Sequence, residues 1–199
     1  NKQKSWETLI ISKNLTWEQF TKVNYFLHDL TGAKPVLSVS RNYPFNENYT
    51  HVLGYVSEAS EKDILNNEEI KNKHVPGLKV GKTGLEKTFE NELIGTNGIQ
   101  RYEVNAYGKR ISQLDYTDGV SGNTIKLTID TEVQKLCNEL LKNVAGSISV
   151  MDIYTGEMIA MQSSPSFNPN LFLFGINQDD WQLIRNNPLK PMVNKTLSG

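Results

Sequence analysis

Lys82 stands in the stretch of the chain whose spacing most suggests chemistry, "VPGLKVGKTGLEKTFENELIG" at residues 75–95. Its triplet G-K-T ends like a phosphate-binding loop, which needs G-x-x-x-x-G-K-[ST] after a buried strand. Pro76 occupies the position of the first glycine, and Gly77 is one residue too close to Gly81. The preceding "NNEEIKNKH" is too polar for a buried strand. The sequence therefore predicts no nucleotide site here.

The overlapping triplet K-T-G at 82–84 and the triplet S-G-N at 121–123 match two signatures of one class of serine acyl-transfer enzymes. That chemistry also needs S-x-x-K, in which the lysine one helical turn later takes the proton of the serine. No serine of this sequence is followed by lysine three positions on. In the active enzymes of that class, moreover, K-T-G is the last of the three signatures, whereas here K-T-G at 82–84 precedes S-G-N at 121–123. We therefore predict no catalytic residue in this chain.

A structural interpretation of the same stretch explains more of it. Gly84 opens a helix whose inward stripe is expected to be Leu85, Phe89 and Leu93. Gly95 follows as the residue that ends the helix. Lys82 and Glu86 are close enough in sequence to form an ion pair across one turn.

Other chemically active residue types are sparse. Cys137 is the only cysteine, which excludes an intrachain disulfide, and we expect it to be a buried, inert thiol. The histidines at 28, 51 and 74 lack the spacing of metal ligands, so neither a metal nor a cofactor is predicted. A formal net charge of −1 gives no basic surface for nucleic acid. No apolar run approaches the roughly 18–20 residues that cross a bilayer.

The first half of the chain predicts a strand–helix–strand unit over about residues 1–45. The strands are expected at 5–14 and 34–45, and the helix between them begins with a capping box of Thr16 and Gln19 and ends near Gly32. A helical turn is expected at 60–66.

In the second half, alternation predicts a hairpin over 98–117 that turns at Tyr107 and Gly108. Further elements are predicted from the local patterns. They are a strand at 123–130, a helix at 131–143 capped by Asp130, two strands in 146–164 with a turn at 154–157 set by Asp152, and a helix near 177–188. Val133, Leu136, Cys137, Leu140 and Leu141 share one helical face, which we expect to be buried. A domain boundary is expected near residues 117–122.

Several motifs, in a fixed order, resemble one protein family. "RNYPFNENYTHVLGYVS" resembles R-x-Y-P…H-x-x-G-Y-V, and "GKTGLEKTFENELIGTNG" resembles a G-K-x-G-L-E segment that starts a helix. "IKLTIDTEVQKL" and "GSISVMDIYTGEMIAMQSSPSFNPNLF" resemble the opening helix and hairpin of a second domain. The family is the class B penicillin-binding proteins. "SPSFNPNLFLFGI" and "ISKNLTWEQF" favour its elongation type, penicillin-binding protein 2. Lys195 and Asn168 depart from the residues common in the family, Arg and Asp.

The resemblance implies an α+β chain. Residues 1–119 would form the pedestal, or dimerisation, domain. Residues 120–199 would supply the first strands and helix of a penicillin-recognising serine transpeptidase domain and stop before its S-x-x-K motif. The nucleophile is then expected beyond Gly199 and a membrane anchor before Asn1.

The function implied by the resemblance is that of the non-catalytic portion of a peptidoglycan D,D-transpeptidase. The parent protein would crosslink stem peptides through an acyl-serine intermediate during cell elongation, anchored in the bacterial inner membrane and facing the periplasm. Its expected partners are peptidoglycan strands and β-lactams, both bound by the missing catalytic domain, a membrane glycosyltransferase, and in a dimer a second copy. The alternative is a stand-alone pedestal-type interaction module without catalysis.

Two segments, 41–56 and 81–95, are expected to form a partner-facing or domain-stabilising surface. Within the first, we interpret Arg41, Tyr43 and Pro44 as packing at a strand end and not as a reactive site.

Overall fold

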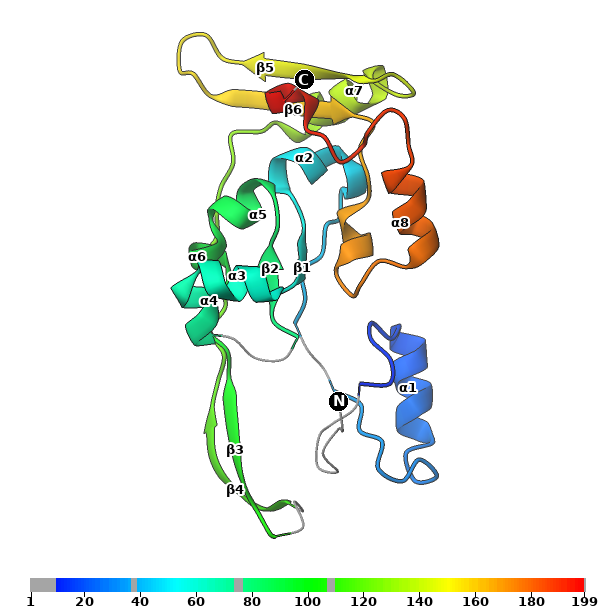
Figure 1. Cartoon of the computed structure of the whole chain (residues 1–199), viewed down its shortest axis with the longest axis vertical. Coiled ribbons are helices and arrows are strands. Elements are labelled where there is room, and N and C mark those ends of the chain that lie inside the picture. Colours follow the sequence, from blue (N-terminus) through cyan, green and yellow to red (C-terminus); the bar gives the residue numbers. More distant parts are fainter. Residues whose placement is uncertain (1–9, 37–38, 74–76, 107–109, 199) are drawn as a thin grey trace. The chain divides into compact units, whose positions relative to one another are not determined.

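The computed structural model describes residues 10–36, 39–73, 77–106 and 110–198. Helices and small antiparallel sheets alternate along the chain, which confirms the predicted α+β class. The chain forms two compact units, each made of two stretches of sequence (Figure 1). The smaller comprises Asn1–Ser40 and Gly98–Asp118, and the larger comprises Arg41–Asn97 and Gly119–Gly199. The division into domains at residues 119 and 120 stays a prediction.

Helix α1 (Trp17–Tyr25) of the smaller unit begins where the sequence predicts it. The Thr16 hydroxyl accepts a hydrogen bond from the Gln19 backbone N–H (3.2 Å), and the Gln19 side chain accepts one from the Thr16 N–H (2.9 Å). This capping box satisfies two amides that the first turn leaves free. The prediction that this helix ends near Gly32 is wrong. It ends at Tyr25, because the next residue, Phe26, leaves helical geometry (φ −94°, ψ 12°).

The prediction of one strand on either side of α1 is wrong for the described residues of both segments. Residues 1–9 and 37–38 lie outside the described part of the chain, and the described residues of 10–14 and 34–45 form no strand. Pro35 and Pro44 cannot donate a backbone hydrogen bond, so this segment is a poor partner for a sheet.

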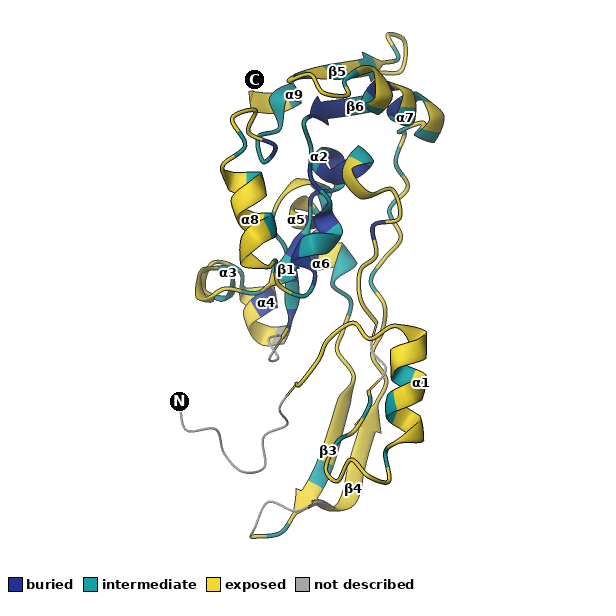
Figure 2. Ribbon diagram, turned by 90° about the vertical axis from the view of Figure 1, so that its right-hand side faces the viewer, coloured by how far each residue is buried: buried dark blue, intermediate teal, exposed yellow. Residues whose placement is uncertain are grey.

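The predicted hairpin of the smaller unit is confirmed. Strands β3 (Ile99–Val104) and β4 (Arg110–Thr117) pair antiparallel, with irregularities in register after Arg101 and after Glu103. The predicted turn at 107–108 lies outside the described residues. Most described residues of both strands are exposed (Figure 2).

The first part of the larger unit is a two-stranded sheet surrounded by short helices (Figure 1). Its elements are η1 (Asn46–Tyr49), α2 (Thr50–Leu53), β1 (Val56–Glu58), α3 (Glu61–Asn66), α4 (Glu68–Lys73), β2 (Lys79–Gly81), α5 (Gly84–Thr88) and α6 (Glu90–Leu93). A small core of Ile70, Leu78 and Val80 packs with Ile64 and Ile94. The predicted helical turn at 60–66 is confirmed as α3.

The second part of the larger unit contains the predicted hairpin of β5 (Gly146–Met151) and β6 (Met158–Ser164). Asp152 Oδ1 accepts hydrogen bonds from the N–H groups of Tyr154 (2.7 Å) and Thr155 (3.1 Å), which confirms its role in the turn. The other elements are α7 (Thr131–Leu140), η2 (Pro169–Phe172), α8 (Gln178–Arg185) and α9 (Lys195–Ser198).

The strand predicted at 123–130 is wrong. Beside β6, the Thr128 hydroxyl donates to Met158 O (2.7 Å) and the Asp130 N–H donates to Ile159 O (2.8 Å). These bonds hold the segment against β6 without forming the repeated ladder that defines a strand.

The inward face predicted for α7 is wrong in part. Cys137 is buried as expected, but Leu136 and Leu140 are 53% and 66% exposed. The fully buried side chain of the helix is Gln134. Helix α7 packs against β6, and a polar side chain can be buried there because all its hydrogen-bonding groups find partners.

The N-cap of α7 gives a first prediction. Asp130 Oδ1 accepts hydrogen bonds from the N–H groups of Glu132 (2.9 Å) and Val133 (3.0 Å). Replacing Asp130 by Ala removes both and should lower the free energy of unfolding by about 1 kcal/mol. Asp130→Ser, which keeps a capping oxygen, is the matched control. Equal denaturation midpoints for Asp130→Ala and the unmodified chain would contradict the role of this cap.

Candidate functional site

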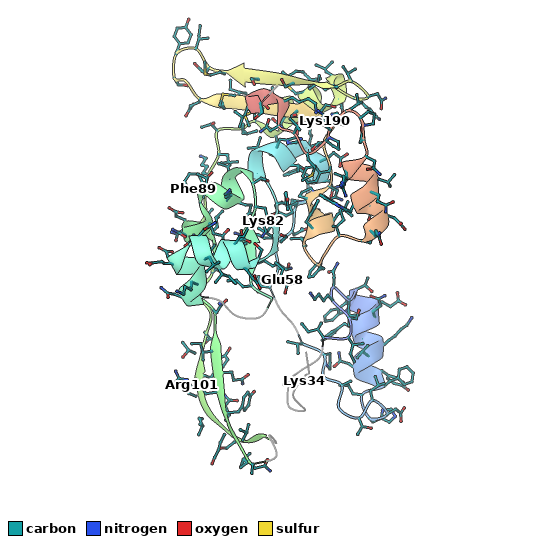
Figure 3. The ribbon with its side chains drawn as sticks, viewed as in Figure 1. Lys34, Glu58, Lys82, Phe89, Arg101 and Lys190 are labelled. Atoms are coloured by element: carbon teal, nitrogen blue, oxygen red, sulfur yellow. The ribbon has the colours of Figure 1, made fainter. Side chains whose placement is uncertain are left out.

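The stretch at 75–95 that suggested chemistry has a structural role in its described residues. Lys82 follows β2 (Figure 3). Its ammonium group pairs with the Asp63 carboxylate of α3, not with Glu86 as predicted. Because β2 ends beside the first turn of α3, Lys82 lies next to the Asp63 carboxylate. Burial alone would raise the pKa of Asp63, but hydrogen bonds from Lys82 and Ser60 outweigh burial and lower it to about 2.

The inward stripe predicted for the following helix is also corrected. The predicted helix is interrupted at Phe89, which separates α5 from α6. The buried residues of these two helices are Glu86 and Glu90, each 8% exposed. Leu85, Phe89 and Leu93 are only half-buried. Gly95 follows α6 with φ 64°, as expected of the residue that ends a helix.

Glu86 is buried because two side chains from the preceding segment neutralise and bind it. Arg41 Nε lies 3.1 Å from Glu86 Oε1 and donates to Oε2 at 3.3 Å, while Arg41 Nη2 donates to Leu93 O (3.2 Å). The Tyr43 hydroxyl donates to Glu86 Oε1 at 3.1 Å. We call Arg41, Tyr43, Glu86 and Glu90 the carboxylate cluster.

The electrostatics of the carboxylate cluster are those of a structural site. Burial, followed by the adjacent Glu86 carboxylate, raises the pKa of Tyr43, so its phenol stays protonated. Burial raises the pKa of Glu90, against the opposing effect of a hydrogen bond from the Gly81 N–H. The cluster therefore joins the segments 41–56 and 81–95, which supports the domain-stabilising half of the hypothesis for them.

A second set of polar contacts joins η1 and α2 to the part of the chain beyond residue 130. The Tyr49 hydroxyl donates to Thr131 Oγ1 (3.1 Å), and the Thr50 hydroxyl donates to Phe167 O (2.7 Å). From the other side, Gln134 Nε2 donates to Asn48 O (2.8 Å). We call the contacts of residues 48–51 with this later part of the chain the α2 junction.

Gln134 is the central member of the α2 junction. Besides Asn48 O, its Nε2 lies within hydrogen-bond distance of Met161 O (3.0 Å) and Gln162 Oε1 (2.8 Å). Its Oε1 accepts from the Met161 N–H (2.8 Å). One buried amide thus ties η1, α7 and β6 together.

Asn170 makes a comparable link to the segment that precedes η1. Its Oδ1 accepts from the Tyr43 N–H (3.1 Å), and its Nδ2 donates to Tyr43 O (2.9 Å). Neither Gln134 nor Asn170 is predicted from the sequence as a connecting residue. The only sequence signal is that each lies inside a motif, "TEVQKL" and "SFNPNLF". Arg41 and Tyr43, interpreted as packing residues, do have structural roles.

The α2 junction also contains a buried imidazole, that of His51. Burial lowers its pKa below the ordinary value of 6.5, and the nearby Lys195 ammonium acts in the same direction. The carbonyl groups of Pro165 and Pro191 oppose this shift. The ring lies edge-on to Phe167, with 6.0 Å between centroids.

The lowered pKa of His51 predicts a pH dependence of stability. Below the ordinary pKa of 6.5 the unfolded chain binds a proton that the folded chain does not, so the free energy of unfolding falls as the pH falls toward the folded pKa. Between about pH 7.5 and about pH 5.5, His51→Gln should lose less stability than the unmodified chain. His28→Gln, which removes an exposed imidazole instead of a buried one, is the matched control. Parallel slopes for His51→Gln and the unmodified chain would refute this prediction.

The S-G-N triplet and Cys137, the other candidates for a reactive site, are held by packing and backbone contacts. In the S-G-N triplet, Gly122 lies against Leu93 O and the Asn123 N–H donates to Glu92 O (2.7 Å). Cys137 is buried, and burial raises its pKa. The described ranges hold no group of three or more His, Cys, Asp or Glu side chains that could share a metal ion. Among these same residues no helix is both long and apolar enough to cross a membrane.

Comparison with known proteins places this arrangement in a family. The model of the penicillin-binding protein dimerisation domain matches residues 1–127, well over half of the chain. The chain belongs to the penicillin-binding protein family. Its segments 41–56 and 81–95, joined by the carboxylate cluster, both lie within the matched dimerisation domain.

Two curated relatives of this penicillin-binding protein segment extend the similarity over almost all of it. The peptidoglycan D,D-transpeptidase MrdA of Acinetobacter baumannii is 33% identical over 193 residues, which cover 97% of this chain and 28% of that protein. The MrdA of Escherichia coli strain K12 is 34% identical over 191 residues, covering 95% of this chain and 30% of that protein. The segment therefore spans less than a third of the length of these relatives.

Solved structures show the same fold. The penicillin-binding protein PBP2 of Helicobacter pylori, in a complex with MreC, matches with a TM-score of 0.77 and 30% identity over 98% of this chain and 36% of that chain. Pseudomonas aeruginosa PBP2, in a complex with WCK 5153, matches with a TM-score of 0.63 and 30% identity over 81% of this chain and 32% of that chain.

Proposed function

We propose that this chain is the non-catalytic portion of a peptidoglycan D,D-transpeptidase of the elongation type. The single observation that carries the proposal is the identity of about one third, over nearly the whole chain, with proteins named peptidoglycan D,D-transpeptidase MrdA. Residues 1–119 serve as the pedestal, and residues 120–199 begin the transpeptidase domain. The serine nucleophile, its lysine and the later signatures lie in the chain beyond Gly199.

The α2 junction supports this division of labour. Residues 48–51 of the pedestal bind Thr131, Gln134 and Phe167 of the proposed transpeptidase portion through directed hydrogen bonds. The pedestal therefore holds the first elements of the catalytic domain in one arrangement. In this role the chain needs no reactive residue of its own, and a membrane-anchored parent protein would display it in the periplasm.

The experiment is acylation of the full-length protein by a fluorescent penicillin, followed by denaturing electrophoresis. The full-length protein should become labelled, and prior incubation with an unlabelled penicillin should abolish the signal. The chain of residues 1–199 should stay unlabelled, because the sequence lacks S-x-x-K. An unlabelled full-length protein, or a drug-sized mass adduct on the short chain, would overturn the proposal.

An interaction role is the second candidate, favoured by one observation. The similar Helicobacter pylori protein was solved in a complex with MreC. In this chain the hairpin of β3 and β4 exposes large apolar side chains, Ile99, Val104, Ile111, Leu114 and Tyr116. The candidate partners are a protein of the MreC kind, the membrane glycosyltransferase and a second copy of the chain. A coding sequence that stops at Gly199 would leave this role in place and remove the transpeptidase.

A further inference from the structure

The last described segment of the chain is held between α2 and the β5–β6 hairpin. On the hairpin side, the Lys195 N–H donates to Ser163 Oγ (3.0 Å), and the Ser163 hydroxyl donates to Val193 O (3.3 Å). The Ser147 hydroxyl donates to Lys195 O (3.3 Å). Ser163 is 1% exposed, so these contacts are inside the unit.

On the opposite side, the Asn194 side chain reaches α2. Asn194 Nδ2 donates to His51 O at 3.2 Å. At its other end, Asn194 Oδ1 accepts from the Thr196 N–H (3.1 Å) and from the Thr196 hydroxyl (2.5 Å). The amide therefore caps the first turn of α9 and fastens that turn to a residue 143 positions earlier.

Only an uncharged amide suits both ends of this contact. The His51 carbonyl needs a donor, whereas the Thr196 N–H needs an acceptor. An aspartate would keep the acceptor but direct an ionised oxygen toward the carbonyl oxygen of His51. A serine would keep a short capping oxygen and lose the reach to α2.

We infer that Asn194 is a positioning residue, which couples α2 of the pedestal to α9 and through α9 to the acyl-transfer site. The inference rests on the proposed function, in which the nucleophile follows in the chain beyond α9. Asn194 does not touch the reacting atoms. It fixes the direction in which the backbone leaves the α2 junction, and small errors in placing reacting groups are costly to rate.

The test uses the full-length protein and fluorescent penicillin. Acylation rates are measured over a range of drug concentrations. They give two separate quantities, the limiting acylation rate and the half-saturating drug concentration. Asn194→Asp should lower the limiting rate about tenfold or more, while the half-saturating concentration and the melting temperature change little. Asn187→Asp is the matched control, because Asn187 Oδ1 caps only the local Leu189 N–H (2.9 Å).

A second measurement follows the contact itself. Amide hydrogen exchange at residues 195–198 should accelerate in Asn194→Asp and stay unchanged in Asn187→Asp. If Asn194→Asp does not fold, Asn194→Ser and Asn187→Ser make the same comparison.

The outcomes separate the inference from the proposed function. An Asn194→Asp enzyme that acylates like Asn187→Asp overturns the inference and leaves the proposed function standing. The inference is also overturned if the acylation rate of Asn194→Asp falls only as much as its folded fraction falls. A wild-type protein that is not acylated rejects the proposed function, and with it the acyl-transfer role of Asn194.

Discussion

Gly54→Ala should abolish folding of the larger unit or destabilise it by more than about 4 kcal/mol. A methyl group at this position would lie 1.9 Å from Thr83 O and 2.4 Å from Thr83 C, both backbone atoms. The backbone of Gly54 also has φ 81° and ψ −155°, a region that only glycine adopts readily. The start of α5 cannot move away from the end of α2 without breaking the hydrogen bond that the Lys82 N–H donates to Tyr55 O (2.9 Å). Yield of soluble protein and urea denaturation measure the effect.

Gly77→Ala is the matched control for Gly54→Ala. Gly77 has the same φ of 81°, but a methyl group there would meet nothing within 4 Å. Its expected cost is therefore that of the backbone conformation alone, about 1–2 kcal/mol. Similar denaturation midpoints for the two variants would show that the close approach of α2 and α5 is not what requires glycine at position 54.

Glu86→Ala has the second largest expected effect, a loss of about 2–3 kcal/mol in the free energy of unfolding. It leaves the Tyr43 hydroxyl without its acceptor and the Arg41 guanidinium without its counter-charge. The Glu86 side chain is 10% exposed and the Arg41 side chain 38% exposed. Water can therefore recover part of the loss at Arg41, which places the estimate below the full cost of breaking a buried pair.

Two further variants show which property of Glu86 matters. Glu92→Ala removes an exposed carboxylate from the neighbouring helix α6 and should change stability by less than about 0.5 kcal/mol. Glu86→Gln keeps an acceptor for Tyr43 but loses the charge, so its denaturation midpoint should lie between those of Glu86→Ala and the unmodified chain. If Glu86→Ala and Glu92→Ala unfold at the same urea concentration, the cluster does not stabilise the unit.

Features that depend on a few neighbouring residues were predictable from the sequence. The alternation of side chains predicted the two hairpins. The caps at Thr16 and Asp130 and the turn at Asp152 follow from side chains that bond backbone groups two or three residues away. No distant partner is needed for these bonds, so the local pattern was sufficient. The order of motifs likewise indicates the family from the sequence alone.

Features that depend on partners far along the chain were not predictable in this way. Helical spacing pointed to Leu85 and Phe89 as the inward stripe, yet Glu86 and Glu90 are buried, because Arg41, Tyr43 and Gly81 supply the charge and the donors that a buried carboxylate requires. Lys82 pairs with Asp63 for a similar reason, since β2 ends beside α3.

The sequence by itself determined the family, the local caps and turns, and the absence of S-x-x-K from this chain. Only the tertiary structure decided which polar side chains are buried and what they connect. Gln134, Asn170 and Asn194 read as ordinary polar residues, and each links segments between 27 and 143 positions apart in the chain. The physical reason is that burial of a polar group is favourable only when its partners are in place. Those partners come together only when the chain folds.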